Sequence, residues 1–322
     1  MKTAIIIVNY KTPWHLKECL KSIWENTNNF HVILVHNSID LESIKVSDFF
    51  KSKYPNDITV IVNEKNLGLV GGVNSAYEEA KNFKRVCFLN SDIIVTKGWL
   101  DELNNALDEN PNAVQVAPDL NHYYEEGKIW RLIKWQIMRR NQVIGSKLYK
   151  LLLKFNPPRS KDSDTGFKAS NLFYQFCTGA CNLVRIEPFI ERGYFWDPNI
   201  IHGYGDDFDT SYFLRQYGEI GVTNKAYVFH FHNISFNKFS SEKSELKRKL
   251  QLYNMLYVIN KWEVRLKKDL ASLDRDELLR LSESSYEVQM MLKYFGIVDV
   301  DPSFRDFIRS IPAKEIGQKL LN

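Results

Sequence analysis

Short apolar runs alternate with amphipathic stretches along the first part of the chain. The runs, which have the Ile, Val and Leu content of strands buried on both faces of a sheet, lie at residues 3–8, 31–35, 59–62, 86–89 and 114–116. Apolar residues at helical spacing predict helices over residues 12–24 and 99–107, and another after a glycine-rich segment at residues 66–74. Strands that alternate with helices predict a mostly parallel, doubly wound α/β sheet.

A similar pattern returns in the second half of the chain. Strands are predicted at residues 176–185 and 226–232, with a helix at 210–217 between them. From Ser241 onward the pattern predicts amphipathic helix, and Asp274 with Glu277 has the spacing of a capping box that starts a second helix. We therefore predict an α/β domain over residues 1–240, with an insertion at about 121–170, and a helical region over residues 241–322.

Composition and charge exclude several classes of protein. The 322 residues are 44% hydrophobic and 25% charged, which is ordinary for a globular protein, and a net charge of +4 does not indicate a nucleic-acid partner. No apolar run approaches the roughly 20 residues that span a bilayer, and the first residues turn polar too soon for a secretory signal. Four scattered cysteines predict reduced, buried thiols, so we expect a cytoplasmic protein.

One segment, residues 128–161, differs from the rest in charge. It holds ten Lys and Arg residues and no Asp or Glu, interleaved with Trp130, Trp135 and aliphatic residues. Such a cationic and aromatic face fits a helix on anionic lipid at the inner face of the plasma membrane. A basic, solvated helical pair that covers the sheet fits about as well, and nucleic-acid binding is the weakest of the three interpretations.

Polar residues follow directly after the predicted strand at residues 86–89. Asn90, Ser91 and Asp92 favour a turn, and open α/β sheets bind ligands at the carboxyl ends of their strands. Asp92 and Asn90 can therefore offer hard oxygen ligands to a Mg²⁺ or Mn²⁺ ion that bridges a diphosphate. An ordinary strand-to-loop turn accounts for the same residues, so the motif needs support from the rest of the chain.

Glycines, carboxylates and histidines elsewhere can supply that support. The glycine-rich segment at residues 66–74 precedes a predicted helix, where the backbone can approach an anionic ligand closely. Three carboxylates crowd into four positions, at Asp206, Asp207 and Asp209. This crowding of carboxylates favours a general base among them over a role in helix N-capping alone. For Asp209 we expect a structural role, in which it holds the start of the helix. His230 and His232 share one face of a predicted strand, where one or both can bind a metal.

The motifs occur in an order that resembles a known family. In chain order they are NYKT (9–12), NLGLVGGVN (66–74), LNSD (89–92), TGAC (178–181), GDDFD (205–209) and a final histidine, His230. This order resembles the bacterial family-two glycosyltransferases with a GT-A fold, most closely the rhamnosyltransferase-like branch, from about Lys2 to Ser235. Single motifs are weak, but six in one order at workable spacings are a specific signal.

The resemblance implies roles for individual residues. Asp92 and His230 would bind Mn²⁺ or Mg²⁺, with His232 as the substitute for His230, and Asp207 of the Asp206–Asp207 pair would be the catalytic base. The implied donor-binding residues are Val8, Asn9, Tyr10, His36, Asn37, Asn66, Gly68, Gly71, Gly72, Asn74, Asn90, Ser91 and Asp92. The implied acceptor-side residues are Thr178, Gly179, Ala180 and Tyr204. Family members usually carry a base-reading Asp at the position of His36, so this chain departs from the family there.

The function that the resemblance implies is sugar transfer. An inverting, metal-dependent enzyme would move a sugar from a UDP- or dTDP-sugar to a growing bacterial surface glycan, either a polysaccharide or a lipid-linked oligosaccharide. A sugar nucleotidyltransferase is one alternative, but such enzymes need a Gly-rich loop with Arg or Lys after the first strand, which residues 9–13 do not provide. The other alternative is a non-catalytic module that binds nucleotide sugars or glycans on the same fold.

Overall fold

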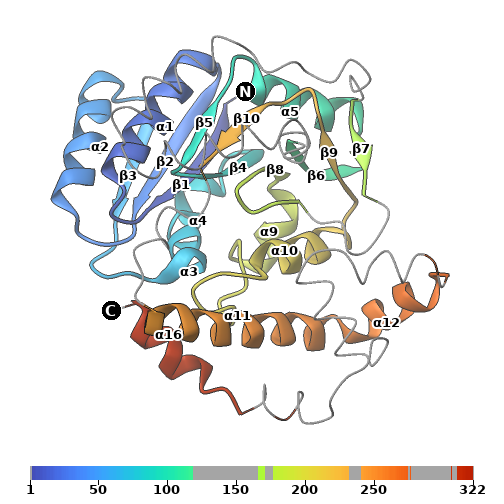
Figure 1. Ribbon diagram of the computed structural model, residues 1–322. Coiled ribbons are helices and arrows are strands. Elements are labelled where there is room, and N and C mark those ends of the chain that lie inside the picture. The colour runs from blue at the N-terminus through green and yellow to red at the C-terminus, as the bar shows by residue number, and fades with distance from the viewer. Residues whose placement is uncertain are drawn as a thin grey trace, which may run out of the picture.

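The computed structural model describes residues 2–118, 166–170, 177–231, 241–274, 276, 306 and 310–321. The basic segment at 128–161, His232 and Glu277 lie outside the described residues, so what was expected of them stays a prediction. In the described part of the chain, helices cover both faces of an eight-stranded sheet (Figure 1). This architecture confirms the predicted α/β class.

The sheet is mostly parallel, as the sequence predicts. Its strand order is β3-β2-β1-β4-β8-β6-β9-β7. Parallel neighbours are β3 (Ile58–Val62), β2 (Phe30–His36), β1 (Thr3–Asn9) and β4 (Arg85–Asn90), and further along the sheet β6 (Ala113–Pro118) and β9 (Glu219–Thr223). β8 (Cys181–Arg185) lies antiparallel between β4 and β6, and β7 (Lys168–Ala169) is antiparallel to β9 at the edge. The end of β4, with Asn90, therefore lies near the middle of the sheet.

Alternate residues of β1 enter different cores. Ile5 and Ile7 belong to the buried cluster that includes α1 (Pro13–Asn26), α2 (Leu41–Lys53) and α5 (Trp99–Glu109). Ala4 and Ile6 belong to the cluster on the other face, with α3 (Gly68–Ser75), α4 (Tyr77–Ala80), α9 (Glu187–Arg192) and α10 (Asp206–Leu214). Because a strand alternates its side chains between the two faces, burial on both explains the unbroken apolar run.

The C-terminal helices extend the second of these cores. They are α11 (Ser241–Lys261), α12 (Glu263–Ala271) and α16 (Ala313–Leu321). Leu250, Leu266 and Ile316, one from each helix, pack in the same buried cluster as Ile6. Figure 1 shows α11 running along the lower side of the molecule, with α16 beside its start. The predicted boundary at residue 240 stays a prediction, but the helices beyond it share a core with the sheet.

The sequence pattern misses several elements and misplaces two helices. It does not predict α2, α9, β7 or β9, and α2 buries Ser43 and Ser47 as well as Phe50, so its apolar periodicity is weak. The helix predicted after the glycine-rich segment begins inside that segment, as α3 at Gly68. α10 begins at Asp206 instead of residue 210, directly after Gly205 with its φ of 87°. Among the described residues, no helix is long and apolar enough to cross a membrane.

Candidate active site

Predicted donor-binding residues meet at the carboxyl ends of the parallel strands. Asn9 at the end of β1 is paired in register with His36 at the end of β2, and Val8 is paired with Asn90 at the end of β4. Neighbouring parallel strands form the usual ligand-binding edge of an open α/β sheet at these ends. The strand register therefore places side by side residues from three segments that are far apart in the sequence.

Buried polar atoms at this edge lack a hydrogen-bond partner among the described residues. They are Asn9 Nδ2, His36 Nδ1 and Ser38 Oγ. The rest of the Asn9 and His36 side chains is engaged: Thr12 Oγ1 donates to Asn9 Oδ1 at 2.6 Å, and His36 Nε2 is 2.9 Å from Ser47 Oγ. Burial lowers the pKa of His36, so its ring is neutral at pH 7. Because a buried polar atom without a partner costs about 1–3 kcal/mol, this edge fits a polar ligand.

Asn37 shapes the glycine-rich segment. Its Nδ2 donates to Asn66 Oδ1 (2.9 Å) and to the Gly68 carbonyl oxygen (2.8 Å). Its Oδ1 accepts hydrogen bonds from Asn63 Nδ2 and from the Leu67 N–H, both at 3.1 Å. Both N–H groups of this buried amide are thus used inside the protein, where they hold the shape of the loop before α3, and direct donor contact by Asn37 stays a prediction.

The glycines of this segment permit close approaches to two other parts of the chain. A Cβ atom on Gly72 would lie 2.7 Å from Val8 Cγ1 in β1. A Cβ atom on Gly68, whose φ is 72°, would lie 2.6 Å from the Cα atom of His202. Gly71 instead faces Leu67 of its own segment, where a Cβ atom would meet the Leu67 Cβ at 2.7 Å. The segment therefore packs tightly between β1 and the loop that contains His202.

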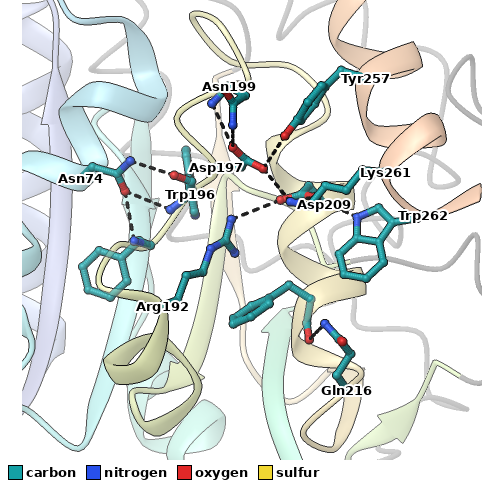
Figure 2. Close-up of polar contacts among 12 residues, drawn as sticks. Asn74, Arg192, Trp196, Asp197, Asn199, Asp209, Gln216, Tyr257, Lys261 and Trp262 are labelled. Carbon is teal, nitrogen blue, oxygen red and sulfur yellow. Dashed lines mark hydrogen bonds and ion pairs between the residues drawn. The ribbon is translucent and has the colours of Figure 1, made fainter.

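Asn74 makes a contact that differs from its predicted role. Its Nδ2 donates to the Trp196 carbonyl oxygen (2.8 Å), and its Oδ1 accepts from the N–H groups of Phe195 (3.1 Å) and Trp196 (2.9 Å), as Figure 2 shows. These bonds tie the end of α3 to the loop before α10. We therefore assign Asn74 a role in holding Trp196 in place, and its direct contact with a donor stays a prediction.

A small cleft lies where the donor-side and acceptor-side residues meet. Its lining includes Val8, Leu69, Phe88, Asn90, Gly179 and Trp196. The sequence analysis singles out neither apolar residue: Leu69 lies within the glycine-rich segment but is not among the predicted donor-binding residues, and Trp196 lies outside the predicted motifs. Only the folded chain brings these apolar side chains to the ends of β1 and β4.

Asp92 and His230 lie together, as the predicted metal pair requires. β10 (Val228–His230) pairs antiparallel with β5 (Ile93–Val95) and places His230 opposite Ile93. His230 Nε2 is 3.1 Å from Asp92 Oδ1 and 3.4 Å from Asn90 Nδ2. The side chains of Asp92 and His230 are each 11% exposed, so both reach the surface of the site from a largely buried position.

This pair fits a divalent metal as a partial ligand set. A carboxylate oxygen and an imidazole nitrogen suit Mn²⁺, and the carboxylate also suits Mg²⁺. Across the described ranges, no group of three or more His, Cys, Asp or Glu side chains could hold a metal ion. The described chain thus offers two such ligands, and water and diphosphate oxygens would have to complete the shell.

The turn at residues 178–180 connects the metal pair with the carboxylate pair. On one side, the Asn90 N–H donates to the Ala180 carbonyl oxygen at 2.9 Å. On the other side, the Gly179 N–H is 3.5 Å from Asp207 Oδ2, and a Cβ atom on Gly179 would be 3.4 Å from Asp206 Oδ2. The predicted acceptor-side turn therefore lies between Asn90 and the two carboxylates.

The two carboxylates have different surroundings. Asp206 is only 5% exposed, and burial, with nearby Asp209, raises its pKa to about 6 although backbone N–H groups of residues 204 and 206 oppose the shift. Asp207 is half-buried, and its Oδ1 accepts from the Phe208 N–H at 2.9 Å. The N-cap position of α10 is Gly205 and Asp207 lies in the first turn of the helix, so the choice between a catalytic and a structural role for Asp207 stays a prediction.

Asp209 has the structural role that its position predicts. It is fully buried, and Lys261 Nζ lies 2.7 Å from its Oδ1, which also accepts from Trp262 Nε1 at 2.8 Å. Arg192 Nη2 is 3.4 Å from the other oxygen of Asp209 (Figure 2). Asp209 therefore ties the start of α10 to α9 and to the end of α11.

Comparison with known proteins agrees with this geometry. The family model described as Glycosyl transferase family 2 matches residues 4–191, which is more than half of the chain. The chain therefore belongs to Glycosyl transferase family 2 and carries a glycosyltransferase domain. The matched range includes Asn90–Asp92 and residues 178–180 but ends before Asp206, Asp207 and His230. No curated protein sequence matches the chain.

Solved structures of glycosyltransferases share the fold. S. aureus TarS 1–349 matches with a TM-score of 0.51 and 14% identity, over 100% of this chain and 81% of that one. GalNAc-T7 with UDP, GalNAc and Mn²⁺ matches with a TM-score of 0.57 and 13% identity, over 99% and 56% of the two chains. The mannosyltransferase PcManGT from Pyrobaculum calidifontis, with GDP-Man and Mn²⁺, matches at 0.51 and 11%, over 99% and 85%. At these identities the similarity shows the fold alone, which confirms the predicted GT-A architecture.

Proposed function

We propose that this chain is an inverting glycosyltransferase that takes a sugar from a nucleotide-sugar donor with the help of Mn²⁺ or Mg²⁺. The observation that carries the proposal is the arrangement around residues 178–180. The Asp92–His230 pair lies on one side of this turn, and Asp206 and Asp207 lie on the other. Donor phosphates on the first side and an acceptor hydroxyl on the second would place the sugar between them.

The donor side of the proposal is supported by the sheet edge. The unpartnered atoms of Asn9, His36 and Ser38 would bond a nucleoside, and the glycine-rich segment would cover the ribose and diphosphate. Two of the structurally similar proteins were solved with UDP or GDP-Man together with Mn²⁺. We keep a UDP- or dTDP-sugar as the proposed donor, although His36 replaces the family's base-reading Asp. The predicted contacts of Tyr10, Ser91 and the remaining donor-side residues belong to this proposal.

The reaction is a single displacement at the anomeric carbon. The acceptor oxygen forms a bond to this carbon while the bond to the diphosphate oxygen breaks, so the configuration inverts. The acceptor proton goes to the Asp207 carboxylate, and the electron pair of the broken bond leaves with the nucleoside diphosphate. A divalent metal on Asp92 and His230 would neutralise charge on the departing diphosphate. Asp207, at the start of α10, would also orient the acceptor hydroxyl.

The acceptor that we propose is a growing bacterial surface glycan, either a polysaccharide or a lipid-linked oligosaccharide. The residues that would contact it are Thr178, Gly179, Ala180 and Tyr204.

We also propose that the protein is cytoplasmic, with the basic segment at residues 128–161 in contact with the inner face of the plasma membrane. Co-sedimentation with anionic but not neutral vesicles, lost at high salt, is the expected result. Equal recovery with anionic and neutral vesicles would contradict the proposed membrane contact of residues 128–161.

The test of the reaction is Asp207→Asn. Nucleoside diphosphate release is measured with Mn²⁺ over a panel of UDP- and dTDP-sugars, with simple glycosides as acceptors. The variant keeps the shape of the side chain but cannot take the proton, so we expect turnover to fall roughly 10²-fold while donor affinity stays within a few-fold. Asp101→Asn, at an exposed position of α5, is the matched control and should be normal.

Other outcomes of this experiment separate the alternatives. Normal turnover by Asp207→Asn with loss in Asp206→Asn would move the base by one residue, and normal turnover by both would contradict the inverting mechanism. Pyrophosphate release from a nucleoside triphosphate and a sugar phosphate would indicate a nucleotidyltransferase. Tight donor binding without turnover by the wild-type protein would indicate a binding module.

A further inference from the structure

Residues 202–205, directly before the carboxylate pair, have an unusual backbone. The φ angles of His202, Gly203, Tyr204 and Gly205 are 71°, 135°, 72° and 87°. The left-handed region is unfavourable for a residue with a side chain, and both His202 and Tyr204 occupy it. Such a segment keeps this conformation only where surrounding contacts hold it.

One side chain of α11 makes these contacts. Asn254 is 0% exposed, and its Nδ2 donates to the carbonyl oxygens of Ile201 (2.8 Å) and Gly203 (2.6 Å). Its Oδ1 accepts from the N–H of Ile201 at 3.2 Å. Both donors and the acceptor of this one amide are thus bound to the backbone of residues 201–203.

The segment is also enclosed on both sides. Toward α11, a Cβ atom on Gly205 would lie 3.2 Å from Met255 Sδ and 3.5 Å from Val258 Cγ2, so a side chain at this position has little room. Toward the donor side, the His202 carbonyl oxygen accepts from the Leu69 N–H at 2.6 Å. Residues 201–205 therefore form a layer between α11 and the glycine-rich segment, and lead directly into Asp206.

The position of α11 is itself set by a buried ion cluster. Lys261 Nζ lies 2.6 Å from Asp197 Oδ2 and 2.7 Å from Asp209 Oδ1, and Tyr257 donates to Asp197 at 3.0 Å. Figure 2 shows the side chains of α11 meeting both carboxylates at this point. Asp197 and Asp209 flank the 201–205 segment in the sequence, so the cluster fixes α11 relative to both ends of it.

We propose that Asn254 is a positioning residue for catalysis. By holding residues 201–205 against α11, it fixes the position of Asp206 and Asp207 relative to the donor. Helix α11 is then part of the catalytic unit. This inference rests on the proposed role of Asp207, because Asn254 itself is placed against backbone and not against a substrate. Loss of the Asn254 amide frees two carbonyl groups and lets the strained backbone relax, which displaces the carboxylates more than the strand ends that bind the donor.

The test compares Asn254→Leu with Leu266→Ala. The first substitution keeps the approximate size and removes all three hydrogen bonds. The second removes buried apolar surface from α12, in the same core, and provides a variant destabilised without any loss of hydrogen bonds to residues 201–203. If Asn254→Leu does not fold, Asn254→Ser leaves room for water on the freed carbonyl groups and replaces it.

Three quantities are measured on the folded proteins. Hydrogen exchange of peptides over residues 199–209 should be at least ten-fold faster in the Asn254 variant than in both the wild type and Leu266→Ala. Turnover should fall ten-fold or more relative to Leu266→Ala, while the dissociation constant for UDP with Mn²⁺ stays within about three-fold. A merely structural role would lower turnover equally in both variants, or weaken UDP binding and turnover together.

Each result decides between the possibilities. Unchanged exchange over residues 199–209 would overturn the proposal, and so would faster exchange with turnover equal to that of Leu266→Ala. If the wild-type protein turns over no nucleotide sugar, the proposed function fails, while the exchange experiment still decides whether Asn254 holds this segment.

Discussion

Replacing Lys261 tests how strongly α11 is fixed to the α/β domain. Lys261→Met keeps a long apolar side chain but removes the charge that two buried carboxylates share, at 2.6 Å from Asp197 and 2.7 Å from Asp209. Asp197 keeps bonds from Tyr257 and Asn199, and Asp209 keeps its bond from Trp262 and its ion pair with Arg192. The two carboxylates would nevertheless remain buried near each other without the ammonium group between them.

The expected loss follows from this geometry. Removing one partner of a buried ion pair costs about 3–5 kcal/mol, and we expect the lower end because the Lys261 side chain is 27% exposed. With about 2.1 cal/mol/K of unfolding entropy per residue, a chain of 322 residues has roughly 0.7 kcal/mol/K. A loss of about 3 kcal/mol then lowers the melting temperature by about 4 °C.

The assay is urea and thermal unfolding at pH 7, with Lys267→Met as the matched control. Lys267 pairs with Glu263 at 2.6 Å on the exposed side of α12, where the side chains are 61% and 38% exposed, so its loss should cost less than about 1 kcal/mol. A Lys261→Met protein no less stable than this control would refute the reasoning.

The pH dependence of the same variant provides a second check. Burial raises the pKa of Asp197, but Lys261 and the other donors lower it more, so the net shift is downward. A lowered pKa contributes stability that is present above the unfolded value of 3.8 and is lost as the pH falls through the folded value. Without Lys261, Asp197 can protonate at higher pH, so the difference in stability from wild type should shrink between pH 7 and about pH 4.

Three further predictions concern the site itself. The pKa of Asp206 is raised to about 6, so the folded state binds more protons than the unfolded state between pH 4 and 6. Asp206→Asn should therefore gain up to roughly 3 kcal/mol on wild type as the pH rises through this range, and a stability difference between the two proteins that is the same at pH 4 and pH 7.5 would contradict this. Gly68→Ala should unfold at lower urea than Gly98→Ala, because both glycines have positive φ but only Gly68 faces backbone, at 2.6 Å; equal midpoints would show that strain alone matters. Calorimetry of UDP with Mn²⁺ should show far weaker binding for Asp92→Asn than for Asn90→Ala, whereas equal losses would remove Asp92 from the metal site.

Much of the fold follows from local sequence. The apolar runs predict the central parallel strands because a strand buried on both faces has no polar positions to spare, and Ile5, Ile6 and Ile7 are all in the core. The same logic fails for α2, whose buried face includes Ser43 and Ser47. Ser47 Oγ donates to the Ile44 carbonyl oxygen and Ser43 Oγ donates to the Asp40 carboxylate, and such buried hydroxyl groups carry no apolar signal.

The sequence also indicates which residues could carry chemistry, through polar motifs at strand ends and before helices. It does not determine their contacts. Asp92 meets His230 because β5 pairs antiparallel with β10, and Asn90 meets Ala180 because β8 pairs antiparallel with β4, pairings between segments far apart in the chain. Periodicity reports that a side chain is buried, but not which distant element buries it.

Asn74 and Asn254 show the limit most clearly. In the sequence Asn74 looks like part of a donor-binding motif and Asn254 like one polar residue on an amphipathic helix. In the structure Asn74 binds the backbone of Phe195 and Trp196, and Asn254 binds the backbone of Ile201 and Gly203. A side-chain amide satisfies whatever backbone groups the packing places beside it, and only the tertiary structure decides which groups those are.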